Sequence, residues 1–153
     1  MAQSAESKAN NKAMELATFY VGEALCGMDI LKIQEINKLL EMTEVPQAPE
    51  YVKGILNLRG QIVTVIDLGR KLDLSPTRLS DTSRNIIVNS QDEYIGLLVD
   101  RISDVVLADW DKIEPPPPNI RGVKGKFFDG VFKTENSLIG ILNIEKVLEG
   151  EEN

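Results

Sequence analysis

The side chains that could carry chemistry in this sequence are few and isolated. The chain has 153 residues and no histidine, which removes the commonest general base and the Ser–His and Cys–His nucleophile pairs. Its one cysteine, Cys26, lies in the apolar run 24–28, where a small buried hydrophobe is favoured over a reactive thiol. This composition also provides no zinc or thiolate cluster. We therefore expect no catalytic residues, no metal and no cofactor.

Asp67 follows an apolar run, 62–66, much as the phosphorylated aspartate of a receiver domain follows a strand. A receiver also needs carboxylates after an earlier strand to hold Mg²⁺, together with alternating helices of full length. The sequence shows neither of these features. We interpret Asp67 as the capping residue at a strand-to-helix turn.

The basic stretch 121–126 contains a GxxG pattern, which in KH domains clamps a nucleic-acid backbone. Here predicted strands flank it, and the net charge of −7 repels nucleic acid. We interpret the stretch as a flexible, solvated loop and expect no nucleic-acid partner. Pro115 to Pro118 is interpreted as a rigid spacer between strands rather than a PxxP ligand.

The composition favours strands over helices. Aromatic residues make up only 5% of the chain, so its core must come from Ile, Leu and Val, whose β-branched members suit strands. No apolar run approaches the roughly 20 residues of a membrane span, so we expect a cytoplasmic protein without direct membrane insertion. The predicted organisation is a disordered tail over 1–13, one folded domain over 14–149 and a short tail over 150–153.

Nine or ten short strands with regular turn signals predict a mainly β fold. The expected strands are 14–21, 24–28, 51–58, 61–68, 85–88, 94–99, 102–107, 127–132 and 138–144. Helical turns are expected at 68–72 and 144–148. The pattern Ile66-Asp67-Leu68 recurs half a chain later as Leu142-Asn143-Ile144, which favours two similar β lobes.

A longer helix is predicted from Ile30 to about Leu40, with Asp29 as its N-cap. Helical rotation places Ile33, Ile36 and Leu40 on one inward face. Leu31 falls off that face and is the apolar residue expected to be exposed.

Five segments, taken in order, resemble the chemotaxis coupling protein CheW family over about residues 14–149. They are Gly27-Met28-Asp29-Ile30-Leu31-Lys32-Ile33-Gln34-Glu35-Ile36, Val52 to Leu68 (VKGILNLRGQIVTVIDL), Arg84-Asn85-Ile86-Ile87-Val88, Gly96-Leu97-Leu98-Val99-Asp100, and Asn143-Ile144-Glu145-Lys146-Val147-Leu148. The resemblance implies two small five-stranded SH3-like β-barrel lobes with short helices, packed around a shared core. It also implies a non-enzymatic scaffold that couples the cytoplasmic tips of methyl-accepting chemoreceptors to the regulatory domain of the histidine kinase CheA, within membrane-associated receptor arrays.

The resemblance assigns two surfaces. Glu35 and Arg59 match a family ion pair near the receptor-binding surface, and an Arg fork suits a carboxylate. The residues that match the receptor-binding groove between the lobes are Ile30, Ile33, Ile102 and Val105. Met28 and Leu31 match the kinase-binding surface.

Two other functions stay open. The chain could be a CheW-like adaptor of another chemosensory pathway. Less favoured is a small-ligand-binding protein or hydrolase that uses the cleft between the lobes.

Overall fold

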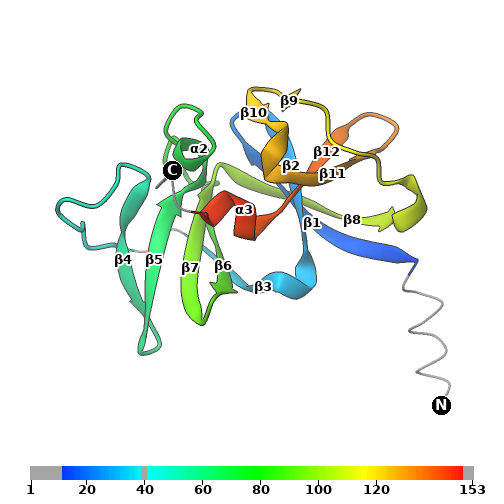
Figure 1. Cartoon of the computed structure of the whole chain (residues 1–153). Helices are drawn as coiled ribbons and strands as arrows, with labels where there is room; N and C mark the ends of the chain where they lie inside the picture. Colours follow the sequence, from blue (N-terminus) through cyan, green and yellow to red (C-terminus); the bar gives the residue numbers. More distant parts are fainter. Residues whose placement is uncertain (1–11, 39–40, 150–153) are drawn as a thin grey trace, which may run out of the picture.

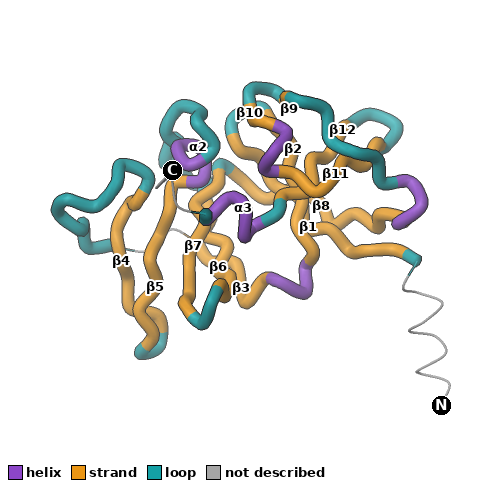
Figure 2. The backbone as a smooth tube through the Cα atoms, viewed as in Figure 1, coloured by secondary structure: helices purple, strands orange, loops and turns teal. Residues whose placement is uncertain are grey.

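The fold consists of two β lobes joined side by side, with only short helical segments (Figures 1 and 2). The computed structural model describes residues 12–38 and 41–149. Of the predicted tails, residues 1–11 and 150–153 lie outside the described residues, whereas Ala13 already begins the first strand. The mainly β architecture of two five-stranded lobes is confirmed.

One lobe is built from both ends of the described chain, and we call it the split lobe. Its sheet has the strand order β11-β12-β2-β1-β8. The strands are β1 (Ala13–Val21), β2 (Ala24–Asp29), β8 (Arg101–Asp109), β11 (Phe128–Lys133) and β12 (Leu138–Leu142). Neighbouring strands are antiparallel except β12 and β2, which are parallel.

The other lobe is one continuous segment placed between β2 and β8, and we call it the inserted lobe. Its strand order is β3-β6-β7-β5-β4, with β5 and β7 parallel. The strands are β3 (Ile33–Lys38), β4 (Val52–Leu58), β5 (Gln61–Asp67), β6 (Arg84–Ser90) and β7 (Glu93–Val99).

The two lobes repeat one topology, as the sequence pattern predicts. Written from the other end, the inserted lobe reads β4-β5-β7-β6-β3, which matches β11-β12-β2-β1-β8 strand for strand. Both lobes close in the same way. Thr43, beyond β3, bridges to Ile55 of β4, and Glu114, beyond β8, bridges to Val131 of β11.

The core is shared between the lobes. Its largest cluster includes Phe19 and Cys26 from the split lobe and Ile86 and Leu97 from the inserted lobe, none of them exposed. Each lobe also has its own smaller apolar cluster. In the inserted lobe that cluster is formed by Leu56, Val63, Val65, Ile87 and Leu98.

The prediction of a helix from Ile30 to about Leu40 is wrong. A single 3-10 turn, η1 (Ile30–Lys32), is capped by Asp29, whose Oδ1 accepts from Leu31 N at 3.0 Å, and β3 follows at once. Leu40 lies outside the described residues. A β-bulge between Ile33 and Glu35 shifts the strand's phase, so Ile33 lies opposite Val88 and Ile36 opposite Ile86. The bulge therefore puts isoleucines three residues apart on one face, as a helix would.

The two predicted helical turns are confirmed as α2 (Leu68–Lys71) and α3 (Ile144–Leu148). Each begins at a polar cap on the end of a strand: Asp67 accepts from Arg70 N, and Asn143 accepts from Lys146 N. α3 lies between the two lobes (Figure 1). No helix in residues 12–38 or 41–149 is long and apolar enough to span a bilayer.

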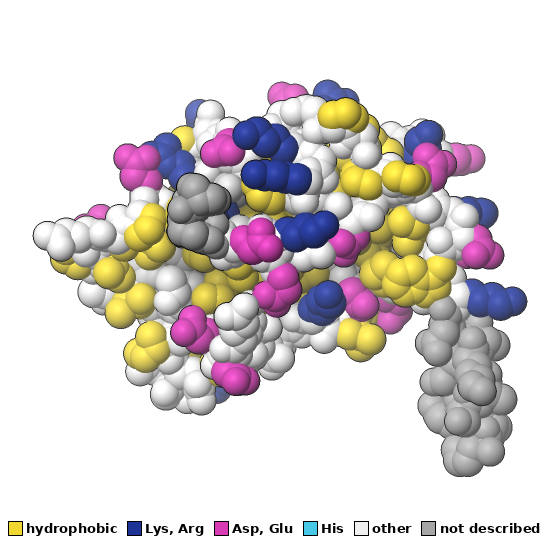
Figure 3. Space-filling view, in the orientation of Figure 1, with side chains coloured by type: hydrophobic (Ala, Val, Ile, Leu, Met, Phe, Trp, Pro, Cys, Tyr) yellow, Lys and Arg dark blue, Asp and Glu magenta, His cyan; other side chains and the backbone are white. Residues whose placement is uncertain are grey.

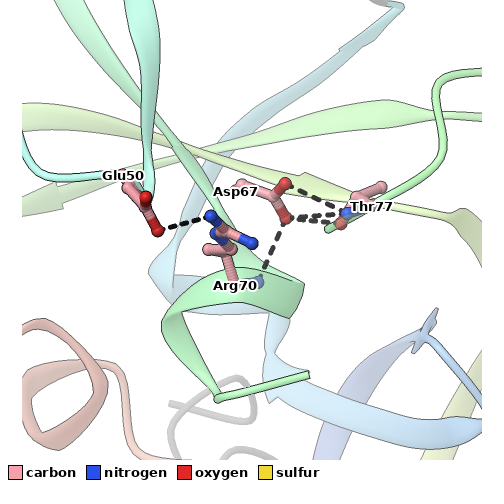
Figure 4. Close-up of polar contacts among 4 residues, drawn as sticks. All are labelled: Glu50, Asp67, Arg70 and Thr77. Carbon is pink, nitrogen blue, oxygen red and sulfur yellow. Dashed lines mark hydrogen bonds and ion pairs between the residues drawn. The ribbon is translucent and has the colours of Figure 1, made fainter. Parts of the chain in front are cut away.

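Asp67 is a structural anchor as well as a cap. Its carboxylate is 3% exposed and also accepts from the backbone N and the Oγ1 of Thr77, the latter at 2.7 Å (Figure 4). These bonds tie the loop after α2 to the end of β5. The carboxylate thus holds the start of α2 and the loop that follows it, and Arg70 pairs separately with the exposed Glu50.

The basic stretch 121–126 is not simply a loop. It includes the second half of a tight hairpin, β9 (Asn119–Ile120) with β10 (Val123–Lys124), followed by the 3-10 turn η3 (Gly125–Phe127). Two-residue strands are too short to give a periodic sequence signal. A further 3-10 turn, η2 (Trp110–Lys112), follows β8.

Candidate functional site

The turn between β4 and β5 places Arg59 at the end of the inserted lobe. Leu58 and Gln61 are paired, so the loop consists of Arg59 and Gly60, with φ of 52° and 85°. Asn57 Oδ1 closes the turn by accepting from Gly60 N at 2.8 Å. Positive φ at both loop positions matches the strand twist, but it is strained for arginine.

Arg59 forms the predicted ion pair with Glu35. Arg59 Nη2 lies 2.5 Å from Glu35 Oε2, and the side chains are 70% and 26% exposed. Glu35 comes from the edge strand β3, not from a helix as the sequence predicted. An ion pair this exposed contributes only about 0–1 kcal/mol to stability, so the pair serves mainly to orient the two groups.

A cavity of about 220 Å³ opens beside the ion pair at the end of the inserted lobe. The buried side chains of Val63 and Ile87 line the apolar part of this cavity. The remaining lining residues, most of them polar, are Gln34, Glu35, Leu58, Arg59, Gln61 and Tyr94. Sequence reasoning did not single out Gln34 or Tyr94, because neither has a signal beyond an ordinary strand position.

The four residues assigned to the groove between the lobes differ in exposure. Ile30 is half-buried, while Ile33 and Ile102 are half-buried and pack against the shared core. Val105 is 61% exposed on β8. Leu107, two residues further along the same strand, is also exposed and points to the same side. Ile30 lies on η1, and the strands that carry the other three residues, β3 and β8, are edges of their sheets.

The two residues assigned to the kinase-binding surface are separated by burial. Leu31 is 86% exposed on η1, as its place off the apolar face predicted. Met28 is only 1% exposed and belongs to the shared core, because it lies two residues from buried Cys26 on β2 and projects to the same side. Its side chain therefore supports the fold under Leu31 and offers no contact surface of its own.

Cys26 is a buried core residue. Burial raises the pKa of its thiol from 9.0 to about 12, so the thiolate that would act as a nucleophile or metal ligand does not form near neutral pH. Within the described ranges, no group of three or more His, Cys, Asp or Glu side chains is placed to hold a metal ion.

On one face of the molecule, basic and acidic side chains are interspersed with apolar ones (Figure 3).

Comparison with known proteins places this geometry in a family. The model of the CheW-like domain matches residues 15–152. "Chemotaxis protein CheW" of Treponema pallidum is 32% identical over 94% of this chain and 86% of its own length. The Bacillus subtilis protein of the same name is 30% identical over 96% of this chain and 92% of its own length.

A solved structure agrees with the sequence matches. The crystal structure of scaffolding protein TtCheW from Thermoanaerobacter tengcongensis has a TM-score of 0.83 and 34% identity, covering 92% of this chain and 90% of its own. The match therefore includes both lobes. The strand order of the two sheets and the residues matched along nearly the full length support one conclusion. This chain belongs to the CheW-like domain family.

Proposed function

We propose that this protein is a non-enzymatic adaptor that couples chemoreceptors to the histidine kinase CheA. Family membership supports a chemotaxis role, and one relative is titled a scaffolding protein. The observation that carries the proposal is the ion pair of Arg59 with Glu35 at the edge of a partly apolar cavity. Such an arrangement suits recognition of a partner's surface better than catalysis.

The receptor-facing surface in this proposal runs between the two edge strands. A helix of the receptor tip would lie against Ile33 and Ile102 and meet exposed Val105, an apolar helix-in-groove contact. Glu35 and Arg59 would fix its orientation at one end. Charged rims contribute specificity and association rate more than affinity.

The kinase-facing surface is proposed at Leu31. A leucine that is 86% exposed on a capped turn offers an apolar anchor for the kinase's regulatory domain. The adaptor would be cytoplasmic and recruited to membrane-associated receptor arrays through its partners. A CheW-like adaptor of another chemosensory pathway would use the same two surfaces with different partners.

A pull-down tests the proposal. The protein, a receptor cytoplasmic fragment and the kinase should form a ternary complex. Arg59→Glu should abolish capture of the receptor fragment and leave the circular dichroism spectrum unchanged. Arg121→Glu, a charge reversal in another Arg-Gly turn, is the matched control and should still bind.

Two results would contradict the adaptor function. One is the absence of a ternary complex with folded wild-type protein. The other is a saturable thermal stabilisation by a metabolite, which would favour the small-ligand alternative.

A further inference from the structure

Asn85 is the most unusual polar residue inside the inserted lobe. It lies on β6 with no exposed surface, and neither its amide nitrogen nor its amide oxygen has a hydrogen-bond partner among the described residues. Its neighbours on the same face, Ile87 along the strand and Leu98 across on β7, belong to the lobe's apolar cluster. An unpaired buried amide is unfavourable, so each case calls for an explanation.

The strand register supplies a partner. Asn85 lies directly opposite Asn37 of β3. Directly opposed residues of an antiparallel pair project to the same face, with Cβ atoms about 4.5–5.5 Å apart. The structure has no direct hydrogen bond between the two amide groups, and their spacing suits one bridging water.

Asn37 already points toward the ion pair. Its Nδ2 donates to Glu35 Oε2 at 3.4 Å, the same oxygen that accepts from Arg59 Nη2 at 2.5 Å. Because Asn37 uses its nitrogen here, its amide oxygen remains to accept from a water that also binds Asn85. A line of polar groups thus leads from the fully buried Asn85 to a guanidinium that is 70% exposed.

We propose that Asn85 is a positioning residue for the Glu35–Arg59 pair. Asn85 Nδ2 donates to one bridging water that in turn donates to Asn37 Oδ1; this fixes Asn37, which holds the Glu35 carboxylate at the rim of the cavity. An exposed ion pair alone defines its geometry weakly, and a connected buried hydrogen-bond chain restricts it. The inference deepens the proposed receptor-binding role and rests on it for the binding measurement alone.

A purely structural role makes different predictions. A buried asparagine can fix strand register, because a one-residue slip of β3 would replace its partner Asn37 by Ile36 or Lys38. In that case its loss would change stability or register and would leave the motion of the Arg59 side chain as it was. The experiment must therefore report on Arg59 itself.

Asn85→Leu removes the amide and keeps the side chain's size. The expected result is a folded protein in which the Arg59 Nε–Hε signal shows increased fast motion in ¹⁵N relaxation. Receptor-fragment affinity should fall about five-fold, the scale of coupling between neighbouring polar groups. On the Glu35→Ala background, the same Asn85 change should have no further effect on affinity.

Leu98→Val is the matched control, because Leu98 lies directly opposite Asn85 in the same apolar cluster and does not line the cavity, so the change perturbs the same face without removing a polar group. It should lower stability and leave both Arg59 motion and receptor affinity unchanged. Should Asn85→Leu fail to fold, Asn37→Ser breaks the same link from the half-buried edge strand.

The outcomes are separable. Unchanged Arg59 motion in folded Asn85→Leu overturns the inference, as does an affinity loss that persists in full on Glu35→Ala. If wild-type protein does not bind the receptor fragment, the proposed function fails, and the relaxation measurement still decides the role of Asn85.

Discussion

Arg59 and Arg121 adopt the same left-handed backbone conformation in two turns of matching chemistry. Their φ angles are 52° and 48°, and each is followed by a glycine with positive φ. The amide N–H of that glycine donates to an asparagine at the start of the turn, at 2.8 Å for Asn57 and 2.9 Å for Asn119. Among the described contacts Arg59 has an ion pair, whereas none is found for Arg121.

Replacing Arg59 by asparagine should separate stability from binding. Asparagine tolerates the left-handed region, so Arg59→Asn should raise the free energy of unfolding by about 0.5–1 kcal/mol, offset partly by loss of the exposed ion pair. Receptor-fragment binding should be lost. Urea denaturation and a binding titration measure the two effects.

Arg121→Asn is the control for this prediction. It relieves the same strain and should give a similar gain in stability with unchanged receptor binding. Loss of binding in both variants would show that turn rigidity, and not the Arg59 side chain, supports recognition.

Removing the Asp67 carboxylate should destabilise the fold strongly. In Asp67→Ala, the Thr77 N, the Thr77 Oγ1 and Arg70 N lose a buried acceptor, which should cost about 2–4 kcal/mol. The midpoint of urea unfolding measures this, and protease cleavage in 72–83 should become faster. Asp129→Ala is the control, because it removes an exposed acceptor of Asn143, and it should lower the free energy of unfolding by under about 1 kcal/mol. Equal losses of stability in the two variants would contradict the anchoring role of Asp67.

Cys26 should make the protein sensitive to alkali. The unfolded thiol ionises near its ordinary pKa of 9.0, whereas burial raises the folded pKa to about 12. Above about pH 9 the unfolded state therefore loses a proton that the folded state keeps, and stability falls by up to about 1.4 kcal/mol per pH unit. Chemical denaturation of wild type and Cys26→Ala at about pH 8 and about pH 10.5 compares the slopes.

The Cys26→Ala variant should start from a lower stability and lose less of it on raising the pH. Parallel curves for the two proteins would show that Cys26 does not cause the alkaline loss. A disulfide-exchange reagent at neutral pH should label wild type only when denaturant is present.

The two halves of the chain should fold only together. Residues 1–79 supply β1 to β5 and residues 80–153 supply β6 to β12, and each five-stranded sheet takes strands from both halves. Each fragment alone should lack the dispersed amide NMR spectrum of the whole protein, and mixing them should restore it. A fragment that gives this spectrum alone would contradict the dependence on the shared core.

Strand positions were largely predictable from the sequence, because alternating burial leaves a two-residue period. The predicted 85–88 and 94–99, for example, fall within β6 and β7. The repeat around Asp67 and Asn143 also predicted the two capped turns that follow parallel-paired strands.

The segment after Asp29 was not predictable in the same way. Its isoleucine spacing is produced by a bulge, and a bulge is set by the pairing of β3 with β6, which lies some fifty residues further along the chain. Local periodicity cannot distinguish it from a helix.

The residues of the candidate site also differ in how far the sequence predicts them. The Glu35–Arg59 pair was predicted only through the family resemblance, because the two residues are 24 positions apart and no local pattern joins them. Met28 was assigned to a surface and is buried, since it lies two residues from Cys26 on β2 and projects into the same core. Asn85 gave no signal, because one polar residue in an apolar strand is ordinary until its burial is known.

The order in which the strands leave the ribosome differs between the two lobes. All five strands of the inserted lobe have been made by Val99, but β2 of the split lobe gains its parallel partner only when Gly140 and Ile141 have been synthesised. Until then one edge of the β1–β2 hairpin has no neighbour, and an unpaired strand edge favours association with other chains. The nascent protein is therefore most exposed to aggregation at its first hairpin, and that exposure ends only with the last one.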